Sequence, residues 1–120
     1  YINSTGNFVG LIGACGNGAL IENVVLDETC ILRGYECVAL VGGTNQMTGT
    51  VTLRNLGNKG NVYASNVQAA GIFGGNTGGK STLIIENCFS TGNIESGSDG
   101  AALVGWGGSQ PSAIHGAVPT

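Results

Sequence analysis

The chain has 120 residues, including 23 glycines, 12 asparagines and 10 threonines, and its formal net charge is −3. Because 42% of the residues are hydrophobic, the chain can bury a core, which argues against a disordered or low-complexity segment. Glycine, asparagine and β-branched residues are poor helix formers, so the composition excludes helix bundles and coiled coils. It predicts an all-β domain of many short strands joined by tight turns.

The distribution of charge and hydropathy argues against nucleic acid binding and against a membrane-spanning segment. The four basic residues are scattered and form no basic stripe, so we expect no nucleic acid partner. The longest apolar runs, such as residues 38–41 and 83–85, are too short to span a bilayer. The chain starts at Tyr1 and shows no signal peptide, so we expect a processed or excised segment.

Four similar units follow one another along the chain. Each opens with a small residue, two bulky apolar residues and a glycine, at residues 10–13, 39–42, 71–74 and 102–105. An apolar residue, a charged residue and asparagine follow at 21–23, 53–55 and 85–87, with a degenerate form at 114–116. A third anchor lies at 60–62 and 92–94, and residues 30–31 occupy its place in the first unit. The first anchor ends each time in a glycine, and these glycines recur at nearly even intervals: Gly13, Gly42, Gly74 and Gly105.

These intervals amount to a period of about 30 residues, which with strand-like content predicts supersecondary units that stack on one another. We expect residues 1–120 to form a single parallel β-helix (β-solenoid) of about four coils, each of about 30 residues and three short strands. Equivalent residues would then lie one strand spacing apart, at roughly 4.8 Å. An antiparallel meander or propeller blade is the alternative. It is disfavoured because its tight hairpin turns favour Asn-Gly pairs, and the chain has only Asn17-Gly18.

Stacking predicts a role for each column of equivalent residues. The glycine column should stand at a corner that needs positive φ or a close approach of two backbones. Val51 and Leu83, with Ala19 and Ile21, alternate with outward positions and should form an inward apolar face. The asparagines of the second anchor should form a ladder in which side-chain amides bond to one another; they are Asn23, Asn55 and Asn87.

A column of alternating charge precedes the asparagine ladder. It contains Glu22, Arg54, Glu86 and His115, so each side chain would have an opposite or titratable neighbour about 5 Å away. A slip of register would bring like charges together. We therefore interpret the column as a register device, and four independent solvent-facing side chains remain the alternative.

The four cysteines, Cys15, Cys30, Cys37 and Cys88, show no CxxC spacing, and the chain has one histidine. We therefore expect no metal site and no cofactor. Cys30 and Cys37 are close enough in sequence to bridge a turn with a disulfide. Buried free thiols are the alternative.

No catalytic constellation is visible, so we expect that the protein is not an enzyme. Glu22 and Glu86 would lie two strand spacings apart, roughly 10 Å, which is close to the carboxylate separation of inverting glycosidases. Arg54 between them would keep both carboxylates ionised, whereas that mechanism needs one protonated acid. A polysaccharide-acting enzyme scaffold is thus the least favoured hypothesis.

The anchor Gly10-Leu11-Ile12-Gly13 resembles the GLUG-motif repeats of bacterial surface and secreted proteins. The likeness extends to the segments Ile85-Glu86-Asn87-Cys88 and Thr91-Gly92-Asn93-Ile94 and covers nearly the whole chain. It departs from the pattern at Cys30, where Gly-Asn is expected, and at Gly116, where the asparagine is lost. The resemblance implies an extracellular, cell-surface or fibre-forming β-helical protein and supplies no catalytic residues.

Both ends of the chain carry an incomplete unit. If a second copy were joined head to tail, the interval from Gly105 to the Gly13 of that copy would again be close to one period. We therefore expect a structural module that stacks on copies of itself, in a filament or in a longer tandem array.

The alternative is an adhesin or carbohydrate-binding module that uses Tyr35, Tyr63 and Trp106 as platforms for sugars. Asn3 begins a glycosylation sequon, Asn3-Ser4-Thr5.

Overall fold

The computed structural model describes residues 1–45, 48–77, 80–106, 113–115 and 118–119. Over these residues the chain forms fifteen strands in three sheets and no helix. Every pair of strands there is parallel. The predicted all-β class with parallel strands is therefore confirmed, and these residues contain no hairpin of the kind that an antiparallel meander needs.

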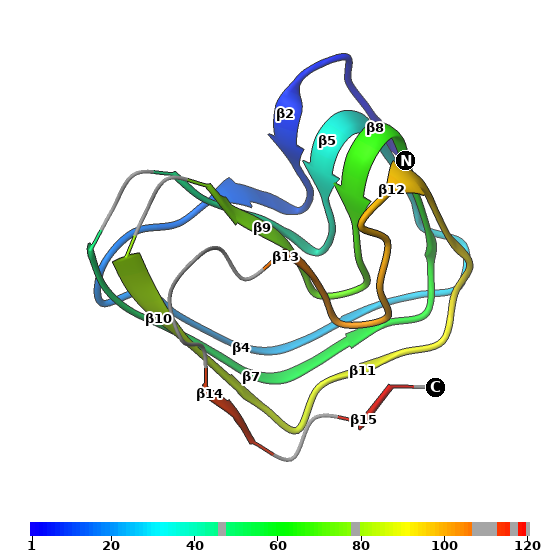
Figure 1. Cartoon of the computed structure of the whole chain (residues 1–120). Helices are drawn as coiled ribbons and strands as arrows, with labels where there is room; N and C mark the ends of the chain where they lie inside the picture. The colour runs from blue at the N-terminus through cyan, green and yellow to red at the C-terminus, as the bar shows by residue number, and fades with distance from the viewer. Residues whose placement is uncertain (46–47, 78–79, 107–112, 116–117, 120) are drawn as a thin grey trace.

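The chain visits three sheets, which we name A, B and C, in the same order four times (Figure 1). We call each passage through the three sheets a round. Sheet A contains β1 (Ile2–Asn3), β2 (Asn7–Val9), β5 (Ile31–Val38), β8 (Asn61–Ala69) and β12 (Ile94–Ser98). β1 and β2 both pair with β5, and in Figure 1 β2, β5 and β8 form an arch that rises from the rest of the molecule.

Sheet B contains four short strands in the order β13-β9-β6-β3. They are β3 (Ile12–Ala14), β6 (Val41–Asn45), β9 (Phe73–Thr77) and β13 (Val104–Trp106). Val41 pairs with Ile12 on one side and with Phe73 on the other, and Phe73 pairs in turn with Val104. Along the chain these partners are separated by the same intervals as the glycine anchors, so each pairing spans one repeat of the sequence.

Sheet C is the widest, and its central strand is the longest of the fold. It contains β4 (Leu20–Leu26), β7 (Thr48–Asn58), β10 (Lys80–Glu86), β11 (Phe89–Ser90), β14 (Ala113–His115) and β15 (Val118–Pro119). β7 pairs with β4 on one side and with β10 and β11 on the other. β14 and β15 continue the sheet beyond β10 and β11.

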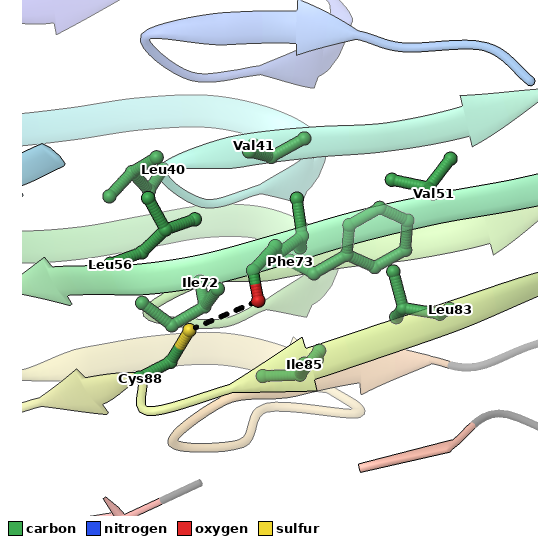
Figure 2. Close-up of a cluster of buried hydrophobic side chains, with 10 residues drawn as sticks. Leu40, Val41, Val51, Leu56, Ile72, Phe73, Leu83, Ile85 and Cys88 are labelled. Carbon is green, nitrogen blue, oxygen red and sulfur yellow. Dashed lines mark hydrogen bonds between the residues drawn. The ribbon is translucent and has the colours of Figure 1, made fainter. Parts of the chain in front are cut away.

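The main core lies between sheets B and C. Leu40, Val41, Ile72 and Phe73 come from the sheet B side and pack with Val51, Leu56, Leu83, Ile85 and Cys88 from the sheet C side (Figure 2), and Leu53 of β7 belongs to the same cluster. The expected inward face is confirmed, because Val51 and Leu83 are buried, and Ala19 and Ile21 of the first round pack against the same cluster. A second cluster within sheet A contains Val9, Leu32, Val38, Val62, Ala64 and Ala69.

Two columns of residues turn the chain with a left-handed backbone. One is the asparagine column, in which Asn23, Asn55 and Asn87 have φ values of 61°, 54° and 52°. Asparagine is the non-glycine residue best suited to this conformation, which costs most other residues about 1–2 kcal/mol. The second column lies at or near the ends of the sheet A strands and consists of Phe8, Cys37, Gln68 and Asp99.

The glycine column packs against this second column. A β-carbon on Gly42 would lie 2.5 Å from the carbonyl carbon of Phe8, and one on Gly74 would lie 2.6 Å from that of Cys37. The predicted close approach is thus present, whereas positive φ is not its cause. In the described residues the glycines with positive φ are Gly18 and Gly49.

Candidate functional site

The strands of the first round lie at an open edge of all three sheets. In the described residues β1 and β2 pair only with β5, β3 only with β6, and β4 only with β7. Their outer edge therefore presents backbone N–H and C=O groups that no strand in this part of the chain pairs. The opposite edges belong to β12, β13, β14 and β15 of the fourth round.

Several apolar side chains at this first-round edge are less buried than the residues with which they pair in the second round. Four inward residues are half-buried, although each pairs with a buried residue one round later: Ile2 with Leu32, Ile12 with Val41, Ile21 with Leu53, and Val24 with Leu56. The same round exposes Tyr1, Leu11, Leu20 (52%) and Val25 (54%). The apolar face of the first round is thus covered by the second round on one side, and no described strand covers it on the other.

Arg54 lies between two carboxylates on the outer face of sheet C. Its Nη1 is 3.5 Å from Oε2 of Glu22, and its Nε is 3.3 Å from Oε2 of Glu86. His115 pairs with Glu86 in the next strand, and its side chain lies outside the described part of the structure. Because the three described side chains are more than a third exposed, each ion pair contributes about 0.2–1 kcal/mol.

The asparagine column follows directly behind this charged row. Asn55 Nδ2 donates a hydrogen bond to Asn23 Oδ1 at 3.1 Å. Asn87 occupies the same place in the third round, with the same left-handed backbone. The three asparagines therefore provide the left-handed backbone conformation of the turn. Asn23 and Asn55 are also joined by a hydrogen bond between their side-chain amides.

The four cysteines are free thiols, so the disulfide between Cys30 and Cys37 is not formed. The carbonyl of Cys30 accepts a hydrogen bond from Asn61 N at the start of β8, whereas Cys37 Sγ donates to Gln68 Oε1, near its end, at 2.8 Å. The two cysteines thus lie at opposite ends of β5. Burial, with a smaller contribution from the Glu36 carboxylate, raises the pKa of Cys37 to about 11.

A pocket of about 490 Å³ lies on sheet A, and all four rounds contribute to it. Residues 3–5, 33–35 and 63–65 line it together with Glu95. Asn3, Arg33, Tyr63 and Glu95 form one row across the sheet, because each pairs with the next in the strand register. Asn3, the residue of the predicted sequon, is exposed at one end of this row.

A cation–π contact joins two side chains of the pocket, Arg33 and Tyr63. The Cζ atom of Arg33 lies 4.1 Å from the centroid of the Tyr63 ring, so the guanidinium covers one face of that ring. Tyr35 is 47% exposed and lines the same pocket. The side chain of Trp106, the third expected platform, lies outside the described part.

The sequence contains a signal for this site, which is the alignment of the third anchor in successive units. Tyr35 and Tyr63 stand at different places in their units, but Arg33 pairs with Tyr63, and Tyr35 follows Arg33 by two residues and so lies on the same face of sheet A. Both tyrosines therefore reach one pocket. The row itself follows from aligning residues 31–33 with 61–63, which places Arg33 beside Tyr63.

Among the described residues, no group of three or more His, Cys, Asp or Glu side chains is placed to hold a metal ion. No helix in this part of the chain is long and apolar enough to cross a membrane.

Comparison of the chain with protein-family models, curated proteins and solved structures gives no match. The resemblance to GLUG-motif repeats therefore stays a prediction.

Proposed function

We propose that the chain is a β-solenoid module with a structural, non-catalytic role, and that its copies stack end to end into a filament or surface fibre. The four rounds would be its coils. Two observations support the solenoid: the order of sheets A, B and C recurs in every round, and partners are separated by about one period along the chain. Each coil would add one strand spacing, roughly 4.8 Å, to the length of the module.

The observation that carries the stacking proposal is the open first round. Four of its inward side chains, Ile2, Ile12, Ile21 and Val24, are half-buried, whereas their partners one round later are buried. A fourth round of a second copy, placed against this edge, would bury these side chains and pair the free backbone groups. A head-to-tail contact of this kind does not close on itself, so it produces an open fibre.

Sedimentation velocity of the purified chain over a range of concentrations tests stacking. The proposal predicts a concentration-dependent series of species that grow by whole copies. Ile21→Lys should abolish the series, because the ammonium group would be trapped between stacked copies without a partner. A chain that stays monomeric at every concentration would overturn the proposal.

Leu20→Lys is the matched control for this variant. Leu20 neighbours Ile21 in β4, but its side chain is exposed on the outer surface and would stay there in a stack. It should assemble as the unmodified chain does. Circular dichroism of both variants establishes that they are folded, and equal loss of assembly in the two would contradict stacking through the inward face.

We further propose an extracellular or cell-surface location. The support is the resemblance of residues 10–13 and 85–94 to GLUG-motif repeats. Treating intact source cells with a protease tests the location. Loss of the protein from intact cells supports it, and full protection until the cells are lysed would overturn it.

A further inference from the structure

We propose that the pocket on sheet A binds a neutral oligosaccharide, with Tyr35 as the stacking surface and Arg33 as a fixed hydrogen-bond donor. The pocket lies within one copy of the chain and does not depend on stacking between copies. Its volume of about 490 Å³ falls within the ordinary range for small-molecule sites, roughly 300–1,000 Å³.

The shape of the site favours an extended ligand. Its central row crosses β1, β5, β8 and β12, which is three strand spacings or roughly 14 Å. A ligand that lies along this row would contact all four rounds in turn. A short chain of sugar rings meets this requirement better than a single small ring.

The charges favour a neutral, polar ligand. Arg33 and Glu95 contribute one positive and one negative group, so the lining as a whole attracts neither anions nor cations. Ser4, Thr5 and Ser65 add hydroxyl groups, and Asn3 adds an amide. A site of this composition offers both hydrogen-bond donors and acceptors, which suits the hydroxyl groups of a sugar.

The two tyrosines have different roles. One face of Tyr63 is occupied by the Arg33 guanidinium, so this ring holds the arginine in place. Among the described residues, no cation lies over the ring of Tyr35, and this residue is 47% exposed. Its ring can therefore pack against the apolar C–H face of a sugar while the held guanidinium donates to neighbouring hydroxyl groups.

Titration with cello-, xylo- and manno-oligosaccharides, followed by calorimetry and by NMR of the backbone amides, tests the site. We use protein made without N-glycosylation, because a glycan on Asn3 would lie at the pocket. At least one of the three should bind saturably and shift amides within residues 33–35 and 63–65. Tyr35→Ala should weaken that binding about tenfold.

Tyr1→Ala is the matched control, because Tyr1 is also an exposed tyrosine but does not line the pocket. It should leave the affinity unchanged. Arg33→Gln provides a second variant, which should also weaken binding if Tyr35→Ala fails to fold. The proposal is overturned if none of the three oligosaccharides binds, if only acidic polygalacturonate binds, if the shifted amides lie elsewhere, or if Tyr35→Ala binds as Tyr1→Ala does.

Discussion

The α-carbon of Gly74 lies directly against the backbone of Cys37, so that a β-carbon on Gly74 would stand 2.6 Å from the Cys37 carbonyl carbon. Cys37 has a left-handed backbone, with φ of 55°. The same relationship joins Gly42 to Phe8. A left-handed residue near the end of a sheet A strand is thus accommodated by a glycine in the sheet B strand of the next round: Phe8 of β2 by Gly42 of β6, and Cys37 of β5 by Gly74 of β9.

Gly74→Ala should destabilise the protein by about 1–3 kcal/mol or prevent folding, because the new methyl group would overlap backbone atoms that cannot move aside. Chemical denaturation measures the change in the free energy of unfolding. Gly16→Ala is the control. No atom lies within 4 Å of its added β-carbon, so its effect should stay within about 0.5 kcal/mol. Equal effects of the two substitutions would contradict the close approach.

The features that could be predicted from the sequence are those in which similar residues recur at a regular spacing. The parallel strands, the inward face at Val51 and Leu83 and the close approach at the glycines followed from periodic spacing alone. The second left-handed column could not be predicted, because its members share no chemistry that favours this backbone: Phe8, Cys37, Gln68 and Asp99. Tertiary packing imposes that conformation on them.

The pocket escaped prediction for a related reason. Its row of side chains comes from the strand register, and Tyr35 lies beside this row because it follows Arg33 by two residues in β5. The four residues of the row differ in type, so no repeated residue marks the row in the sequence. The sequence left open whether Cys30 and Cys37 form a disulfide. Residues that are near in sequence can be far apart in space when an extended strand separates them, as β5 does here.

Arg54→Glu should destabilise the protein by about 1 kcal/mol, since it replaces two ion pairs by repulsion from Glu22 and Glu86. Thermal unfolding at low ionic strength measures the effect, and added salt should reduce it. Lys59→Glu changes the charge equally at an exposed site outside this row. If the two variants lowered the melting temperature equally, the row would have no role in register.

Asn55→Ala should destabilise the protein more than Asn55→Gly, by about 1 kcal/mol. Both variants lose the amide bond to Asn23, but only alanine meets a steric cost at φ of 54°. Urea denaturation of the two variants gives this difference. An alanine variant as stable as the glycine variant would show that the left-handed backbone imposes no steric cost at Asn55.

Stability should fall at alkaline pH through Cys37. The unfolded thiol ionises near its ordinary pKa of 9.0, whereas burial and the neighbouring Glu36 raise the folded pKa to about 11. The folded state therefore keeps its proton longer, and this contribution is complete below pH 9.0 and is lost as pH rises towards 11. Unfolding free energies of the unmodified chain and of Cys37→Ala, measured across this window, should converge. A constant difference would contradict the raised pKa.

Electron cryomicroscopy of the concentrated protein tests the central proposal, end-to-end stacking of a solenoid, most directly. We predict unbranched filaments in which the strands of successive copies run parallel and continue sheets A, B and C at a spacing of roughly 4.8 Å. The first-round strands of one copy should pair with the fourth-round strands of the next. Dispersed single copies, or filaments joined through their sides with β4 still exposed, would contradict it.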